Sequence, residues 1–314
     1  MKKLLLSVAF ASALAVPLAC DLEKTSNQLQ ANKVMVATIL STPSFDIQPA
    51  ALAGIDANFF PEWDGGTFFP TDSGFDGGGF DAGNGFRFDG GALTIPGQTA
   101  TFIFFGARKS QSLDSPPDGI SGAQVSVQPS GGAVTNLKEE GAGNYQKTSA
   151  DDSAFSYVPG ADYLFNVTSA GEKFVGKVEK APALERISEF HPAKGYIEHT
   201  AGSSFTFVRP EPPAEETRNL GFIFVYPIKE DGQKGEQTYT NIPKTPLDFL
   251  ELIAAPSEWR GSPVTIPGTA FPQSKRTYII VFQSVKTGGP ESDNLFTGSA
   301  LLAGTAEIGI VKTQ

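Results

Sequence analysis

The sequence predicts an all-β protein with two β-sandwich domains, built mostly from antiparallel strands, and a long loop rich in Gly, Asp and Phe near the N-terminus. Three observations predict this class. Short apolar runs alternate with turn signals from residue 92 to the C-terminus. The turn signals are rich in Pro and Gly, which favour tight turns through the fixed φ of Pro and the positive φ open to Gly. The length of 314 residues suits roughly two domains with cores of their own.

Composition divides the chain into five segments. Residues 1–19 are interpreted as a signal peptide, and residues 20–54 as an anchor, a tether and a first strand. Residues 55–91 form the Gly/Asp/Phe-rich loop. Residues 92–182 and 183–314 are predicted to form the first and the second β-sandwich domain.

The N-terminus has the pattern of an export signal. Lys2 and Lys3 precede an apolar run over residues 4–16, and the small residue Ala19 stands directly before Cys20. A basic start, a short apolar stretch and a small residue before the cut describe a bacterial secretory signal peptide. The apolar run, about thirteen residues long, is too short to span a bilayer as a helix.

The sequence Leu18-Ala19-Cys20 resembles the cleavage site of the bacterial lipoprotein family. This resemblance implies that Cys20 becomes the N-terminus and carries acyl chains. Several acyl chains would anchor the protein stably to the inner or outer membrane, on the periplasmic or surface side of the cell envelope. The alternative is ordinary cleavage after Ala15 or Ala19, which would release an exported protein with a free thiol. Lipidation explains the position of the single Cys, because an exposed thiol is a liability in an oxidising compartment.

The mature chain begins with a polar stretch. Residues 22–33 are predicted to form a short helix or a tether. Residues 34–40 are apolar and suit a buried strand, with a helix as the alternative, and Pro43 ends the run.

Residues 55–91 hold ten Gly, eight Phe and six Asp. Glycine at this density costs too much backbone entropy for regular structure, so a long loop or spacer is expected. Eight solvent-exposed aromatic rings would promote non-specific association, and some are therefore expected to pack on the neighbouring domain.

The same segment holds the candidate metal ligands Asp76, Asp81 and Asp89. Its Gly and Asp residues partly match the nonapeptide calcium repeat, in which Gly permits tight turns and Asp oxygens line up at fixed intervals. The intervals here are irregular, and no EF-hand spacing appears. The alternative is an acidic spacer that its charge keeps soluble.

Strands are expected wherever a short apolar run lies between turns. In the first domain these runs are 102–105, 123–127, 155–157, 163–167 and 174–178, and in the second they are 204–207, 222–226, 264–266, 278–282 and 308–311. Residues 222–226 are apolar at every position, which indicates a central strand covered on both faces. Residues 245–252 suit either a helix or a strand.

Three turn-and-strand signatures resemble the immunoglobulin-like and carboxypeptidase-regulatory-like β-sandwich modules of exported bacterial proteins. They lie at residues 122–125, 141–145 and 159–163. The resemblance implies an immunoglobulin-like fold, and no catalytic residue comes with it. The Cys-Trp-Cys core of antibody domains is missing.

Charge and cysteine content exclude several classes. A net charge of -10 and a pI near 4.8 argue against a nucleic-acid partner, because phosphate contacts need clustered Lys and Arg. One Cys excludes an internal disulfide framework and a cysteine-rich metal site. The motifs of serine hydrolases and phosphate-binding loops are absent from the sequence.

A hydrolase would require acids or histidines from distant loops to meet in one pocket. His191 and His199 are the candidate bases, and the adjacent pairs 139–140 and 151–152 are candidate acids, although adjacent carboxylates usually point apart. Trp63 and Trp259 are candidate sugar contacts, because an aromatic ring stacks on the apolar face of a sugar, whereas most sandwich aromatics belong to the core.

The absence of a convergent catalytic set predicts a non-catalytic lipoprotein of the cell envelope that presents a binding or structural surface. Its expected partners are the membrane, through the lipid, and an envelope protein or polysaccharide. No cofactor is expected. A calcium- or carbohydrate-binding module and a hydrolase are the alternatives.

Overall fold

A computed structural model describes most of the chain. Strands dominate it and pair mostly antiparallel, which confirms the all-β class. Cys20, the loop over residues 55–91 and most of residues 245–252 lie outside the part that the structure describes. The described residues are 22–48, 51, 93–109, 117–214, 216–230, 234–242, 252 and 256–314.

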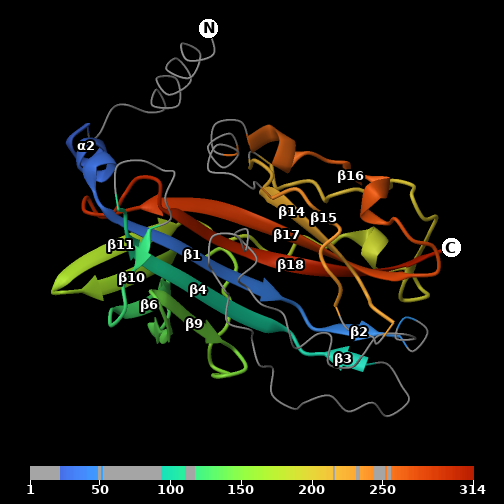
Figure 1. Ribbon diagram of the computed structural model, residues 1–314, viewed down its shortest axis with the longest axis horizontal. Coiled ribbons are helices and arrows are strands. Elements are labelled where there is room, and N and C mark those ends of the chain that lie inside the picture. Colours follow the sequence, from blue (N-terminus) through green and yellow to red (C-terminus); the bar gives the residue numbers. More distant parts are fainter. Residues whose placement is uncertain are drawn as a thin grey trace, which may run out of the picture.

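The elements fall into two groups, which Figure 1 shows along one long axis. The first group is α2 (Leu22–Gln30), β1 (Lys33–Thr42), β2 (Phe45–Ile47), β3 (Leu93–Ile95), β4 (Gln98–Ala107), β5 (Asp118–Gly119), β6 (Gln124–Pro129), β7 (Thr135–Asn136), β8 (Lys138–Gly141), β9 (Asn144–Thr148), β10 (Tyr163–Ser169) and β11 (Glu172–Val178). The second is η3 (Ser188–Phe190), β12 (Ile197–His199), β13 (Phe205–Phe207), β14 (Leu220–Pro227), β15 (Tyr239–Thr240), η4 (Pro256–Arg260), β16 (Val264–Ile266), η5 (Gly268–Ala270), β17 (Thr277–Pro290) and β18 (Ala300–Thr313).

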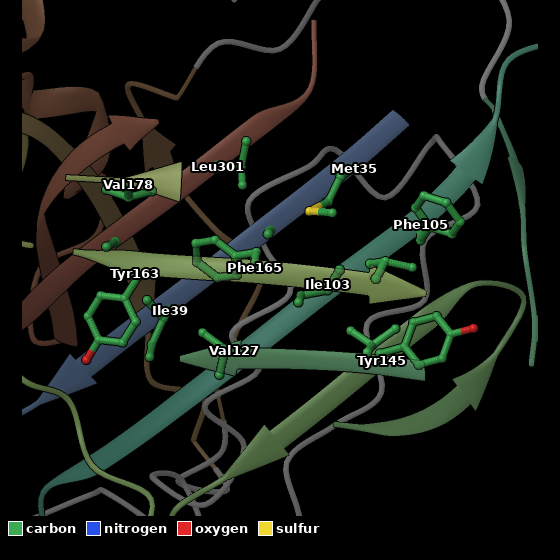
Figure 2. Close-up of a cluster of buried hydrophobic side chains, with 14 of the residues drawn as sticks. Met35, Ile39, Ile103, Phe105, Val127, Tyr145, Tyr163, Phe165, Val178 and Leu301 are labelled. Carbon is green, nitrogen blue, oxygen red and sulfur yellow. The ribbon is translucent and has the colours of Figure 1, made fainter. Parts of the chain in front are cut away.

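The first group forms two layers around one hydrophobic core. One layer has the strand order β1-β4-β9-β8 and the other has the order β7-β6-β10-β11, with every neighbouring pair antiparallel. Figure 2 shows side chains of both layers meeting between the strands. Alternate residues of these strands face the core: Val125 and Val127 of β6 and Phe165 and Val167 of β10 are all buried there.

The second group is built on the strands β14-β17-β18, in this order, with β15 paired to β14 and β12 paired to β18. β14 is covered on both faces, as its apolar sequence predicts. Phe222 and Phe224 pack into one hydrophobic cluster, and Ile223 and Val225 pack into another. The second cluster includes residues of the small sheet β13-β16, which therefore covers this face.

The long hairpin β17-β18 joins the two groups. One half of β17 pairs with β14, and its last residues pair with β11 at Gly289 and Pro290. The first half of β18 pairs in parallel with β1, and its last three residues pair in parallel with β12. The hairpin thus continues both layers of the first group and forms the centre of the second.

Two glycines permit the close contact between β11 and the hairpin. A Cβ on Gly288 would lie 1.9 Å from the backbone oxygen of Lys177, and a Cβ on Gly176 would lie 2.2 Å from Leu301 Cδ2. A side chain at Gly288 would therefore push β11 and β17 apart, and one at Gly176 would displace the side chain of Leu301.

Two buried tyrosines hold equivalent corners in the two groups. The backbone N–H of Val158 donates to the hydroxyl of Tyr163 at 2.7 Å, and the N–H of Gln273 donates to the hydroxyl of Tyr278 at 3.0 Å. Burial raises the pKa of the Tyr163 phenol, which keeps it protonated. Tyr163 lies at the start of β10, the middle strand of β6-β10-β11, and Tyr278 lies at the start of β17, the middle strand of β14-β17-β18. Each group therefore has a buried tyrosine at the start of this middle strand.

The strand prediction for residues 155–157 is wrong, although Phe155 is buried. The N–H of Tyr157 bonds the side chain of Thr99, and its hydroxyl bonds the carbonyl of Pro182, so this segment pairs with no neighbouring strand in the described structure. The strand predicted over 34–40 is confirmed as β1. The polar stretch before it contains a helix, α2.

Candidate functional site

The candidate site lies beneath residues 181–191, which leave β11 and cross the β17-β18 hairpin. The carbonyl of Ala183 accepts a hydrogen bond from the Thr305 hydroxyl of β18 at 3.3 Å. The segment ends in η3, where Phe190 is buried against β18. Gly309 makes room for this ring, because a Cβ there would lie 2.9 Å from Phe190 Cγ.

Glu307 of β18 is a buried carboxylate at the centre of this site, with a side chain only 2% exposed. It accepts a hydrogen bond from the backbone N–H of Ile187. His191 Nε2 lies 2.5 Å from its Oε1, and Arg186 Nε lies 4.0 Å from the same atom. All three partners come from the crossing segment, so Glu307 fixes that segment to the hairpin.

A small pocket opens beside this carboxylate. It lies where the edge of β18 is free of a neighbouring strand, because β1 leaves β18 after Thr305 and β12 joins it only at Val311. His191 is partly exposed and borders the pocket. The lining residues are Thr42, Pro43, Ser44, Phe45, Arg186, His191, Ala306, Glu307 and Ile308.

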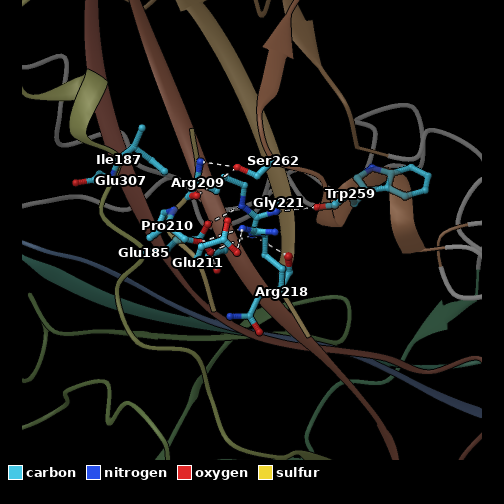
Figure 3. A network of polar contacts seen from close by, with 12 residues as sticks. Glu185, Ile187, Arg209, Pro210, Glu211, Arg218, Gly221, Trp259, Ser262 and Glu307 are labelled. Carbon is cyan, nitrogen blue, oxygen red and sulfur yellow. Dashed lines mark hydrogen bonds and ion pairs between the residues drawn. The ribbon is translucent and has the colours of Figure 1, made fainter. Parts of the chain in front are cut away.

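A buried ion pair joins the crossing segment to Arg209, which follows β13 (Figure 3). The guanidinium of Arg209 is fully buried and forms a two-point contact with Glu185, with Nε–Oε1 at 2.5 Å and Nη2–Oε2 at 2.9 Å. Arg209 also donates to the carbonyls of Asn219 and Trp259. The Ser284 hydroxyl of β17 donates to Glu185 at 2.7 Å. Both charges are thus paired and hydrogen-bonded, as burial requires.

Glu189, on the same segment, is also held in place. Partial burial would raise the pKa of this carboxyl, but hydrogen bonds from the Ser188 hydroxyl and the backbone N–H of Val208 hold the pKa below its ordinary value. Glu189 thus stays charged and links the crossing segment to the residues after β13.

The carboxylate–imidazole pair could in principle move a proton. Acyl transfer would also need a hydroxyl or thiol hydrogen-bonded to the imidazole. Within the described ranges, His191 makes no hydrogen bond to a hydroxyl or a thiol. Nor do the residues that the structure describes contain a group of three or more His, Cys, Asp or Glu side chains placed to hold a metal ion. The geometry favours a structural role for the pair.

The structure separates the two histidines. His199 is outside the pocket, and its Nε2 lies 2.8 Å from the carbonyl oxygen of Ser203. Its ring packs edge-on against Phe205 and Phe271.

The adjacent carboxylates hold turns. The N–H of Gly122 donates to Glu139 at 2.8 Å and lowers the pKa of that carboxyl. Asp151 accepts a hydrogen bond from the Thr148 hydroxyl at 2.8 Å. Neither residue borders the pocket.

Trp259 is partly buried in η4 and packs on the cluster that contains Phe222. Its indole N–H donates to the carbonyl of Asn241 at 2.7 Å. This position anchors η4 to the sheet, and a sugar contact at Trp259 stays a prediction. The other candidate residues, Cys20, Trp63, Asp76, Asp81 and Asp89, lie outside the described residues.

Sequence reasoning missed Glu185, Arg209 and Glu307. Glu307 did leave a signal, because it is the only charged residue in the otherwise apolar and small-residue run from 300 to 311. A lone charge in such a run indicates a buried, paired group. Arg209 and Glu185 are 24 residues apart in loops and leave no comparable signal.

We expect Glu307→Ala to lower the free energy of unfolding by about 1–3 kcal/mol, because the buried N–H of Ile187 would lose its acceptor. The matched control is Glu198→Ala, which removes an exposed contact to Lys194 and should cost less than about 0.5 kcal/mol. Urea unfolding of the mature chain carrying Cys20→Ala measures both. Equal losses in the two variants would refute the clamping role of Glu307.

Among the described residues, no helix has the length and apolar character needed to cross a membrane. No known family model matches the chain, and no curated protein matches it.

Proposed function

We propose that the protein is a non-catalytic lipoprotein of the bacterial cell envelope, in which two immunoglobulin-like modules form one elongated body that presents a surface to an envelope protein or polysaccharide. The observation that carries the proposal is the shared β17-β18 hairpin. It fixes the two groups of strands to each other, and the charged residues beside it hold the crossing segment in place.

Strand order supports the immunoglobulin-like assignment of the first module. Immunoglobulin-type sandwiches have one sheet with the order A-B-E-D and one with the order C-F-G. The orders β1-β4-β9-β8 and β6-β10-β11 correspond to these sheets when the strands are lettered along the chain. Tyr163, at the start of the strand lettered F, makes the hydrogen bond typical of a tyrosine corner.

The second module follows the same lettering, although its strands β13 and β16 have only three residues each. The antiparallel pair β13-β16 corresponds to B and E, and β14-β17-β18 corresponds to C, F and G. Tyr278 repeats the corner at the start of β17. In this assignment the F–G hairpin of the second module extends to pair with strands A and G of the first, β1 and β11.

The sequence supports the anchoring part of the proposal. The export signal over residues 1–19 ends at the only Cys in the chain. Acylation of Cys20 would hold an acidic protein on a membrane whose anionic headgroups repel it.

Cys20→Ala tests the anchor directly. Wild type is expected in the membrane fraction, with an intact mass above that of the chain starting at Cys20 by the mass of its acyl groups. The variant is expected in the soluble fraction without that mass. A wild-type mass equal to the unmodified chain would refute lipidation.

Crosslinking on intact cells tests the binding role. We expect wild type to give a defined crosslinked product with an envelope protein or polysaccharide, and Cys20→Ala to lose that product because it leaves the membrane. The proposal would be contradicted if wild type is found on the membrane but gives no crosslinked product under conditions that crosslink other envelope proteins.

A further inference from the structure

We propose that the end of the molecule formed by α2 and the turn between β17 and β18 rests on the headgroups of a lipid bilayer, so that the second group of strands projects away from the membrane. We call this turn, residues 291–299, the hairpin tip. The inference rests on the proposed acylation of Cys20.

Helix α2 is fixed to the hairpin tip. Gln28 is 7% exposed, and its Nε2 donates to the carbonyls of Pro290 and Ser292 at 3.2 Å each. Its own carbonyl accepts the N–H of Thr297 at 3.1 Å. These three hydrogen bonds, two from the buried side-chain amide and one to the backbone carbonyl, fix Gln28 to the hairpin tip and to the adjoining end of β17, and so hold the helix in place.

The chain after α2 is held at the same place. The N–H of Phe296 donates to the carbonyl of Lys33 at 2.7 Å. The guanidinium of Arg108, at the end of β4, lies 3.8 Å over the ring of Phe296. The N–H of Arg108 also donates to the carbonyl of Asn32 at 2.8 Å. Contacts within the helix and directly after it therefore tie this segment to the tip.

The acylated residue has a short reach. Cys20 precedes Leu22, the first residue of α2, by two positions, and two residues span at most about 7 Å. The acyl chains must enter the bilayer within this distance of the helix start. A segment docked in this way cannot act as a long flexible tether, so the bilayer surface lies beside α2 and the hairpin tip.

The surface of the tip is too polar to enter the hydrocarbon core of a bilayer. Its exposed side chains include Glu291, Asp293 and Asn294, and its one long aliphatic residue, Leu295, is fully buried. Polar and charged groups are costly in the bilayer core. The tip is therefore expected to contact the headgroup layer without inserting.

The β17-β18 hairpin fixes the orientation of the second group of strands relative to the membrane. β17 has 14 residues and leads away from the tip for about 48 Å. Figure 1 shows α2 at one end of the long axis and the C-terminus at the other. The surface offered to a partner is therefore the end that carries β13, β16 and the C-terminus.

Two labels on the same hairpin test this orientation. Asp293→Cys places a thiol at the tip, and Ser274→Cys places one just before β17, both at exposed positions. Because Cys20 is acylated in the proposed protein, each introduced Cys is the only free thiol. Each lipidated variant is labelled at its introduced Cys with a small fluorophore and reconstituted into phosphatidylcholine vesicles. A quencher attached to the lipid headgroups lowers the fluorescence when the label lies close to the bilayer surface.

We expect quenching at position 293 to exceed quenching at position 274 severalfold. Equal quenching, or stronger quenching at 274, would overturn the orientation. A Gly–Ser spacer of about ten residues after Asp21 extends the link by roughly 18 Å and should reduce quenching at 293 severalfold. Unchanged quenching would contradict the role of the short link.

Mass and flotation separate the two hypotheses. An unacylated protein that does not float with the vesicles refutes the proposed anchor. If the protein is acylated and floats with the vesicles, but the fluorophores at positions 293 and 274 are quenched equally, the orientation alone is refuted.

Discussion

Glu185→Ala is expected to lower the free energy of unfolding by about 3–5 kcal/mol, the largest effect of any single side-chain truncation in this site. The guanidinium of Arg209 is fully buried and forms two short contacts with Glu185. Removing the carboxylate leaves a buried positive charge whose remaining described hydrogen bonds go only to carbonyl oxygens. Urea unfolding of the mature chain carrying Cys20→Ala measures the loss.

Glu211→Ala is the matched control. Glu211 contacts Arg218 at 3.1 Å, but its side chain is 87% exposed, so its removal should cost less than about 1 kcal/mol. The double variant Glu185→Leu, Arg209→Met should recover part of the loss, because it removes both buried charges. Similar losses for Glu185→Ala and Glu211→Ala would show that the buried pair does not hold the crossing segment.

Gly288→Ala is expected to destabilise the protein by about 1–3 kcal/mol, although it adds a single methyl group. That methyl would lie 1.9 Å from the backbone oxygen of Lys177 in β11. A backbone atom cannot rotate away as a side chain can, so β11 and β17 must separate. Because this is where the hairpin joins one layer of the first group, the loss would fall on the connection between the two groups.

The neighbouring Gly289→Ala isolates this effect. A Cβ on Gly289 meets no atom within 4 Å, and its backbone is outside the left-handed region. Its substitution should be neutral or stabilising by up to about 1 kcal/mol, because alanine restricts the unfolded chain. Denaturant midpoints of the two variants give the comparison. Equal stability of the two variants would mean that the β11–β17 contact contributes little to the free energy of unfolding.

The sequence revealed the strand cores that have clear chemical patterns. Residues 163–167 alternate between buried and outward positions, and residues 222–226 are apolar throughout, so both were predicted as strands. β18 is longer than predicted, because its first half is rich in Ala and Gly, which are depleted in strands. Those small residues occur where β18 lies close to other backbone and side chains, as at Gly304.

The partners of the strands and of the charged residues were beyond sequence reasoning. Glu307 meets His191 across 116 positions, and Gln28 reaches Pro290 across 262. Such contacts depend on the path of the β17-β18 hairpin through both groups. The local sequence does not reveal a hairpin that pairs with both groups of strands, because the residues of a strand do not specify which strands it will pair with.

This hairpin is expected to make the two groups of strands one cooperative body. Scanning calorimetry of the chain from residue 20 onward, carrying Cys20→Ala, tests this most directly, because the ratio of calorimetric to van't Hoff enthalpy reports how many units unfold together. We expect one transition with equal calorimetric and van't Hoff enthalpies. Two resolved transitions in this protein, each with its own midpoint, would contradict it.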